Sequence, residues 1–415
     1  MDEFEYIRLR RTVNRPTQFL AFGLRYHRSM SDPRRSVPRR LFLAASAARI
    51  LGANDIIRIG AIGVGGRCRG LLDKLTQLPG NRIVATSDVF APARDLAWGD
   101  RPIKVATPVT QYADYRRLLD DKNVDAVVIG SPDHWHVPML RAAVAAGKDV
   151  YCEKPVTHSR DDGAGLVAAV EASRQVVQIG YQQRSTDVFR TGKRALEDGL
   201  LGKVTMAQAF WYQNYLARRG IYRPTDPAQL DWKAWLGPAP ARPFELLRYA
   251  RWRWFWDYGG GSITDLYSHW GDTIHWYFGL KKPSKVFAQG DRVELTEFEC
   301  PDTLNASWLY PGLQVTYAST IIASLEGGGF ILRGTKAMMK ITRSAVTVYP
   351  EGVIRQESAA YPDPILHEPS KRDGTIDHLE NWLDCIRSRK QPNAPVRAAV
   401  EIANASHAAN QILRG

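Results

Sequence analysis

The sequence lacks long apolar runs, paired cysteines and compact basic clusters, and each absence excludes a class of protein. No apolar stretch approaches the roughly 18 residues that a membrane-spanning helix requires. The four cysteines stand far apart without C-x-x-C spacing, which argues against a structural zinc site and a disulfide framework. Of the net charge of +13, +7 falls in residues 1–53, which hold 11 arginines and 4 acids, and no compact Lys/Arg run stands in the remainder. We therefore expect neither a membrane nor a nucleic acid as partner.

The chain of 415 residues is long enough for two domains. Residues 54–180 alternate short apolar strands with helices, which is typical of a doubly wound parallel sheet. Within residues 181–415, strands follow one another from 286 to 349 without intervening helices, and this pattern predicts a large open, mostly antiparallel sheet. Two predicted helices, 375–387 and 396–413, close the chain. The predicted fold class is α/β followed by α+β.

Residues 1–53 read as a leader rather than as part of the fold. Arg39 and Arg40 precede a modest apolar segment and then small residues, as in a twin-arginine export signal. Arg49 interrupts the apolar segment, and Met30 is an alternative start. We expect export to the periplasm; a disordered basic tail on a cytoplasmic enzyme is the alternative.

A glycine turn follows the first apolar strand. The strand covers residues 57–62, Gly63, Gly65 and Gly66 come next, and leucines then recur at helical spacing. Strand, glycine turn and helix form the setting in which a dinucleotide pyrophosphate sits on a helix N-terminus. Cys68 stands where a third glycine usually allows helix and strand to pack closely, and it is small enough to be tolerated.

Asp88 ends the second predicted strand, 82–88, and lies 25 residues after Gly63. A carboxylate near this offset takes the adenosine ribose hydroxyls in dinucleotide-binding folds. Its charge repels a 2′-phosphate, so NAD(H) is favoured over NADP(H). We therefore interpret residues 54–180 as an NAD-binding Rossmann domain.

Three side chains form the predicted catalytic group: Lys154, Asp265 and His269. Lys154 ends a parallel strand, whereas Asp265 and His269 stand four apart on a predicted helix over 262–278, with Asp272 three residues further on the same stripe. Histidine suits removal of a hydroxyl proton, a lysine charge stabilises an alkoxide, and an acid orients the substrate or the imidazole. A surface lysine and a helix-surface pair remain the plain alternatives. We expect no metal, because no third ligand is evident and Lys154 would repel a cation.

Tryptophan is concentrated in one passage: eight of twelve fall between Trp211 and Trp276. Most are expected in the core, but an exposed indole beside a polar site suits the apolar face of a sugar ring. The predicted substrate contacts are Lys154, Trp256, Asp265, His269 and Asp272.

Four motifs in this order resemble the Gfo/Idh/MocA oxidoreductases, and in particular their exported twin-arginine members. They are Gly-Val-Gly-Gly-Arg at 63–67, Ser-Pro-Asp-His-Trp-His at 131–136, Glu-Lys-Pro at 153–155 and Gly-Gly-Gly-Ser-Ile-Thr-Asp-Leu-Tyr-Ser-His-Trp at 259–270. The resemblance implies a Rossmann domain followed by an α/β domain with a large open sheet, paired into dimers or tetramers. It also implies sugar, inositol or related substrates.

By this likeness, Lys154 matches the lysine of the family's Glu-Lys-Pro, and Asp265 and His269 match its Asp-x-x-x-His. Ser131 and His136 would then lie near the nicotinamide ribose, and Glu153 near the cofactor. The expected cofactor-binding set is Gly63, Gly65, Gly66, Arg67, Asp88, Ser131, His136, Glu153 and Lys154.

Three functions remain open at this point. The first is an NAD(H)-dependent dehydrogenase of a sugar, glycoside or polyol. The second is a redox-neutral, glycoside-cleaving enzyme with tightly bound NAD. The third is a non-catalytic nucleotide-dependent binding or sensor protein, against which the intact Lys154, Asp265 and His269 argue.

Overall fold

The computed structural model describes residues 56–99, 102–220, 225–351 and 361–415. The predicted leader, with Arg39 and Arg40, lies outside the described residues. All the described residues fall within one compact unit, Leu51–Gly415, which contains two sheets.

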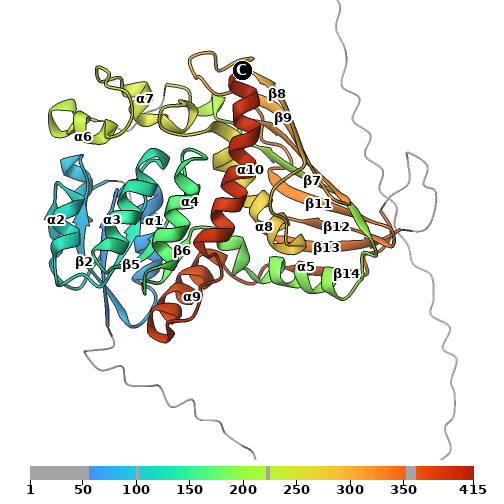
Figure 1. Ribbon diagram of the computed structural model, residues 1–415, viewed down its shortest axis with the longest axis horizontal. Helices are drawn as coiled ribbons and strands as arrows, with labels where there is room; N and C mark the ends of the chain where they lie inside the picture. The colour runs from blue at the N-terminus through green and yellow to red at the C-terminus, as the bar shows by residue number, and fades with distance from the viewer. Residues whose placement is uncertain (1–55, 100–101, 221–224, 352–360) are drawn as a thin grey trace, which may run out of the picture. The chain divides into compact units, whose positions relative to one another are not determined.

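The first sheet is parallel and has six strands in the order β3-β2-β1-β4-β5-β6 (Figure 1). Its inner strands are buried along nearly their whole length, as expected of a parallel sheet covered on both faces. The predicted doubly wound sheet is confirmed. The strands are β1 (Ile57–Ile62), β2 (Asn81–Ser87), β3 (Thr110–Tyr112), β4 (Ala126–Ile129), β5 (Asp149–Cys152) and β6 (Val177–Ile179), and the helices between them are α1 (Gly66–Leu75), α2 (Tyr115–Asp120), α3 (His136–Ala145) and α4 (Asp162–Glu171).

A helix from the far end of the chain completes the core of this sheet. Leu379 and Trp382 of α9 (Gly374–Ser388) are fully buried in the same apolar cluster as Leu71 and Leu72 of α1. Although the sequence pattern places these residues with the second domain, they pack on the nucleotide-binding half.

The second sheet has eight strands in the order β14-β13-β12-β11-β7-β10-β9-β8. Only β7 and β10 pair in parallel among these strands, so the prediction of a mostly antiparallel sheet is confirmed. The strands are β7 (Val204–Tyr212), β8 (Lys285–Asp291), β9 (Thr303–Tyr310), β10 (Leu313–Thr320), β11 (Gly328–Gly334), β12 (Ala337–Ile341), β13 (Ala345–Pro350) and β14 (Leu366–Pro369).

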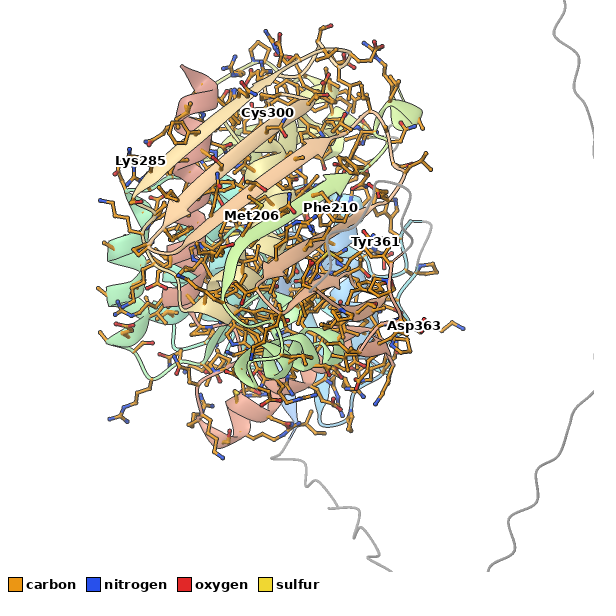
Figure 2. All side chains as sticks on the ribbon, turned by 90° about the vertical axis from the view of Figure 1, so that its right-hand side faces the viewer. Met206, Phe210, Lys285, Cys300, Tyr361 and Asp363 are labelled. Carbon is orange, nitrogen blue, oxygen red and sulfur yellow. The ribbon has the colours of Figure 1, made fainter. Side chains whose placement is uncertain are left out.

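Helices cover one face of this sheet and leave the other open (Figures 1 and 2). Ala207 and Ala209 of β7 face inward and are buried, whereas Met206 and Phe210 alternate to the outer, partly exposed face. The covering helices are α5 (Asp187–Glu197), α8 (Ser268–Phe278) and α10 (Val396–Arg414). Among the described residues, no helix combines the length and apolarity needed to cross a membrane.

The predicted single helix over 262–278 is corrected in its first part. Residues Ile263–Tyr267 form a π-helical turn, and the α-helix α8 begins only at Ser268. A π-helical turn shifts backbone hydrogen bonds from i−4 to i−5, and the N–H of Ser268 donates accordingly to the carbonyl of Ile263. Asp265 therefore stands on an irregular turn, and His269 on the regular helix that follows.

Candidate active site

The glycine turn between β1 and α1 has the geometry that its sequence predicts. Gly63 has a φ of 72°, and a Cβ there would lie 2.6 Å from the backbone nitrogen of Ser131. A side chain would therefore be strained and would also collide with the chain after β4. Cys68, the departure from a third glycine, packs against Gly130, where a Cβ would come within 2.7 Å of the Cys68 Cβ. Cys68 fits at this position because Gly130, which packs against it, has no side chain.

Asp88 turns back onto the glycine turn. Its Oδ2 accepts the N–H of Val64 at 2.7 Å and its Oδ1 accepts the N–H of Phe90 at 2.8 Å. Burial raises the pKa of Asp88, although these two N–H groups and Arg94 act in the opposite direction. The carboxylate is thus fixed at the end of β2, beside the first turn of α1.

The residues around this turn fit a dinucleotide. No side chain caps the N-terminus of α1, and a Cβ on Gly65 would meet nothing within 4 Å. The Nη2 of Arg67 and the Oγ of Ser131 are buried without a hydrogen-bond partner, although buried polar atoms are nearly always paired. An anionic nucleotide bound across this turn would supply the missing acceptors.

Glu153 and His136 organise the end of β5. The Nε of Arg67 donates to Oε1 of Glu153 at 2.8 Å, which links the glycine turn to the residue before Lys154. Both ring nitrogens of His136 face backbone carbonyls, Nδ1 that of Pro155 at 2.7 Å and Nε2 that of Ser131 at 3.0 Å. His136 therefore braces the chain after β4 against the chain after β5 and has no ring nitrogen free for a ligand.

Lys154, after β5, and Asp265, on the π-helical turn before α8, form an ion pair between two segments that are distant in the sequence. Lys154 Nζ lies 2.7 Å from Asp265 Oδ1 and 2.5 Å from the Asp265 carbonyl oxygen, and the two side chains are 9% and 11% exposed. Arg253 Nε approaches the same Oδ1 at 3.2 Å. Burial alone would raise the pKa of Asp265, but the charges of Lys154 and Arg253 outweigh it and lower the pKa to about 2.

Arg253 is a member of the site that sequence patterns did not single out. It lies in the aromatic passage before the glycine run, with its guanidinium 4.2 Å from the ring centre of Trp252. A Cβ on Gly259 would lie 2.9 Å from the Arg253 Cα, so the glycine is what permits this close approach. The run of glycines that precedes Asp265 therefore also lets Arg253, the second cation that contacts Asp265, take its place.

His269 lies beside this pair on α8. Its Nδ1 lies 3.3 Å from Oε1 of Gln183, and its ring stacks on that of Trp211 with centroids 5.8 Å apart and an interplanar angle of 22°. Burial first, and then the positive charges of Lys154, Arg343 and Arg67, lower the pKa of His269 well below its usual range. The imidazole is therefore neutral near pH 7. With Nδ1–H assigned as the donor to Gln183, Nε2 keeps the lone pair of a base.

Asp133 adds a buried acid close to the pair. It follows β4 in the Ser-Pro-Asp-His motif and is 3% exposed. Burial first, and then the negative charge of Asp265, raise the pKa of Asp133 well above its usual range. The motif was visible in the sequence, but nothing in it distinguished this acid from its neighbours.

Two predicted substrate residues do not join this group. Asp272 is fully buried, and both of its oxygens accept hydrogen bonds from Arg184 at 2.8 Å. Trp256 packs instead against the C-terminal helix, with the guanidinium of Arg414 4.5 Å from its ring centre. The structure places Asp272 in a buried ion pair with Arg184 and the half-buried Trp256 against Arg414, and the indole beside His269 is that of Trp211.

The assembled groups suit oxidation of an alcohol. A neutral imidazole accepts the hydroxyl proton, and an ammonium with three donors, two of them used by Asp265, keeps one for the oxygen. Within the described ranges, no group of three or more His, Cys, Asp or Glu side chains is placed to hold a metal ion.

Comparison with known proteins matches both halves of the chain to family models. Residues 57–181 match the model described as "Oxidoreductase family, NAD-binding Rossmann fold", and residues 189–340 match the "GFO/IDH/MocA C-terminal domain". Inositol 2-dehydrogenase 1 of Saccharopolyspora erythraea is 37% identical over 149 residues, which cover 35% of this chain and 43% of that relative. The chain thus spans less than half the length of this curated relative.

Two solved structures share the fold. Myo-inositol 2-dehydrogenase from Lactobacillus plantarum superposes with a TM-score of 0.63 at 19% identity, over 86% of this chain and 96% of that one. Aldose-aldose oxidoreductase from Caulobacter crescentus, complexed with glycerol, gives a TM-score of 0.64 at 21% identity, over 86% and 97% of the two chains. At these identities the likeness extends to the fold alone.

Proposed function

The chain belongs to the GFO/IDH/MocA oxidoreductase family, and on that premise we propose that it is an NAD(H)-dependent dehydrogenase of a carbohydrate. The substrate would be a sugar, glycoside or polyol, oxidised at a CH–OH group. The observation that carries this proposal is the buried Lys154–Asp265 ion pair beside a neutral His269.

Each residue then has one task. His269 takes the hydroxyl proton, and Lys154 donates a hydrogen bond to the oxygen as negative charge develops on it. Asp265 holds the ammonium at two of its atoms, so that Lys154 does not have to reorganise during the reaction. When bound, NAD⁺ supplies the hydride acceptor.

The choice of NAD over NADP rests on Asp88. Its carboxylate stands at the end of β2 next to the first turn of α1, where the adenosine ribose lies in such folds. A 2′-phosphate would place negative charge beside this carboxylate. NAD is therefore the cofactor that we expect.

The test is to incubate the purified protein and NAD⁺ with pyranosides, glycosides and inositols while following NADH and carbohydrate products together. NADH that accumulates in step with a keto-sugar supports the dehydrogenase. Absence of both NADH and product across the panel contradicts it.

A second candidate, redox-neutral cleavage of a glycoside with resident NAD, is favoured by one feature. Residues 225–258, here called the strap, contain α6 (Trp232–Leu236) and α7 (Leu246–Ala250) and cross from the second sheet to the first. Leu230 forms a β-bridge with Phe90 after β2, and the carbonyl of Trp235 accepts Nε1–H of Trp135 after β4 at 2.8 Å. A strap tied to both strand ends would slow the departure of a nucleotide lying between them. Product sugar released without net NADH, from protein that purifies with its nucleotide, supports this candidate.

Self-association is proposed for the outer face of the eight-stranded sheet (Figure 2). Phe210 and Tyr212 stack there with centroids 5.8 Å apart, and Phe287 and Leu309 are 63% and 42% exposed. Apolar side chains gathered on one face mark interaction sites. Light scattering after gel filtration should give a dimer or tetramer that Phe287→Lys weakens, and a wild-type monomer contradicts the proposal.

Export by the twin-arginine route is also proposed, on the sequence of Arg39 and Arg40. Cell fractionation should find the wild-type chain in the periplasm and the double variant Arg39→Lys, Arg40→Lys in the cytoplasm. Cytoplasmic retention of the wild type would remove this proposal.

A further inference from the structure

Arg343 occupies the tip of the β12–β13 hairpin. The turn is held by Thr342, whose N–H donates to the Ala345 carbonyl at 2.9 Å and whose Oγ1 accepts the N–H groups of Ser344 at 3.2 Å and Ala345 at 3.3 Å. A turn tied at three points gives its central residue a defined backbone position. The position of Arg343 is thus set by local chemistry and not by a mobile loop.

The guanidinium of Arg343 packs on two indole rings next to the active site, those of Trp211 and Trp270. It stands 5.0 Å from the ring centre of Trp211 and 5.5 Å from that of Trp270. The Trp211 ring stacks in turn on His269. Arg343 is therefore separated from the proposed base by one indole.

The cation has no acidic partner in the part of the chain that the structure describes. Arg343 forms no ion pair there, and the two acids whose charges act on it contact other cations: Asp373 contacts Lys74, and Asp265 contacts Lys154 and Arg253. Its accessible surface is that of an exposed residue, yet the protein atoms around its guanidinium and the charge of Arg67 lower its pKa to about 10. Asp373 and Asp265 act in the opposite direction, but neither forms an ion pair with Arg343 among the described residues.

A guanidinium whose face packs on an indole keeps its in-plane N–H groups free, and those groups match the two oxygens of a carboxylate or phosphate. We propose that Arg343 is a specificity residue that binds an anionic group, a carboxylate or phosphate, carried by the carbohydrate substrate. The inference rests on the proposed function and narrows its substrate class to acidic sugars, such as uronates or sugar phosphates.

The cofactor pyrophosphate carries the same chemistry and is the other source of an anion near Arg67. The two sources differ in what a substitution changes. A substrate contact alters discrimination between an acidic sugar and its neutral counterpart, whereas a pyrophosphate contact alters the affinity for NADH and leaves that discrimination intact.

The test compares Arg343→Gln with Arg343→Lys and with Lys340→Gln. Lys340 is a partly exposed lysine on β12 in the same hairpin, so its substitution removes the same charge three residues away. For each variant with NADH bound, we measure the dissociation constants of glucuronate, glucose 6-phosphate and the neutral reference glucose. The dissociation constant of NADH itself is measured separately by fluorescence.

We expect the wild type to prefer an acidic sugar by about tenfold or more, as a charge-assisted hydrogen bond allows. Arg343→Gln should remove this preference with neutral sugar and NADH affinities within about twofold, Arg343→Lys should keep part of it, and Lys340→Gln all of it. No preference in the wild type, a preference that survives Arg343→Gln, or a loss of NADH affinity in its place would overturn the proposal.

The same samples separate this inference from the proposed function. If no sugar yields NADH while the acidic preference depends on Arg343, the dehydrogenase fails and the anion site stands. If neutral sugars are oxidised equally by wild type and Arg343→Gln, and acidic ones are not preferred, the dehydrogenase stands and the anion site fails.

Discussion

Lys154 meets Asp265 through two atoms at once, the carboxylate Oδ1 at 2.7 Å and the backbone carbonyl at 2.5 Å, across 111 residues of sequence. Lys154 lies two residues after β5 of the parallel sheet, and Asp265 stands on the π-helical turn before α8. The contact therefore ties the nucleotide-binding half to the substrate half where the reaction is proposed to occur. Because Arg253 also contacts Asp265, loss of Lys154 would not leave the carboxylate without a partner.

Replacing Lys154 with Met should lower kcat by about 10²–10³-fold, because the donor aimed at the developing alkoxide is lost. Affinity for NADH should change little, since Arg67 and the glycine turn are untouched. Steady-state kinetics and NADH fluorescence measure the two effects. Lys154→Arg, which keeps the charge but not the compact ammonium, should recover only part of the rate. A kcat near that of the wild type in Lys154→Met would contradict the assigned role.

His269→Gln should lower kcat by about 10²–10⁴-fold through loss of the base. The lowered pKa of His269 also fixes the pH dependence: protonation removes the base, and it occurs well below pH 6.5. The wild-type kcat/KM should therefore stay flat from about pH 8 to pH 6 and fall only in more acidic solution. An acid limb centred near pH 6.5 would show that His269 is not buried in the working enzyme.

Local patterns predicted the parts of the site that depend on local structure. The glycine turn and the end of β5 follow from the periods of strands and helices. The regular helix expected from Asp265 to His269 was wrong at Asp265, which stands on a π-helical turn. Arg253, Gln183 and Trp211 were missed, because each reaches the site through packing between distant segments rather than through a pattern along the chain.

The prediction for Asp272 shows the limit of assigning function from residues that share one face of a helix. Nearly every residue of α8 is buried, from Ser268 to His275, so its faces cannot be ranked by exposure. The sequence alone therefore does not distinguish an acid on that helix that binds substrate from one that pairs with a buried arginine, as Asp272 does with Arg184. The strands β3 and β14 escaped prediction because both are short and partly exposed, so no apolar run marks them as it marks the equally short but buried β4, β5 and β6.

Asp88→Ala should weaken binding of NAD⁺ and narrow its advantage over NADP⁺. The substitution removes the carboxylate that repels a 2′-phosphate and also the acceptor for the Val64 N–H. Asp88→Asn keeps one oxygen acceptor and separates the two effects: it should preserve the turn while losing charge repulsion. Dissociation constants for both cofactors provide the measurement. An unchanged NAD⁺ to NADP⁺ ratio in both variants would rule out Asp88 as the discriminating residue.

Trp135→Phe should speed the release of NADH by about fivefold, since the substitution deletes one hydrogen bond between the strap and the chain after β4. Trp308→Phe is the matched control: its Nε1–H donates to the Ala405 carbonyl at the same 2.8 Å, inside the second half of the chain. Stopped-flow transfer of tryptophan fluorescence to NADH gives the rates. Equal release rates in both variants would show that the strap does not retain the nucleotide.

Buried histidines set the acid limit of stability. Seven of the nine histidines have pKa values lowered first by burial, to about 4 for His134 and His378 and to about 3 for His275 and His407. Between the unfolded value near 6.5 and these folded values the unfolded chain binds more protons, so the free energy of unfolding falls as the pH falls. Asp265, with its pKa of about 2, loses its contribution only below about pH 4.

Urea unfolding should therefore show a decline in stability that begins near pH 6.5, opposed in part by Asp133, whose raised pKa makes its protonation favour the folded chain. His158→Gln should reduce the slope of this decline, because it removes one depressed pKa. A decline that begins only below pH 4 would mean that the histidines are solvated in the native protein. The same measurement also tests the burial of His269, because burial that lowers the pKa of the imidazole also lowers the free energy of unfolding in this pH range.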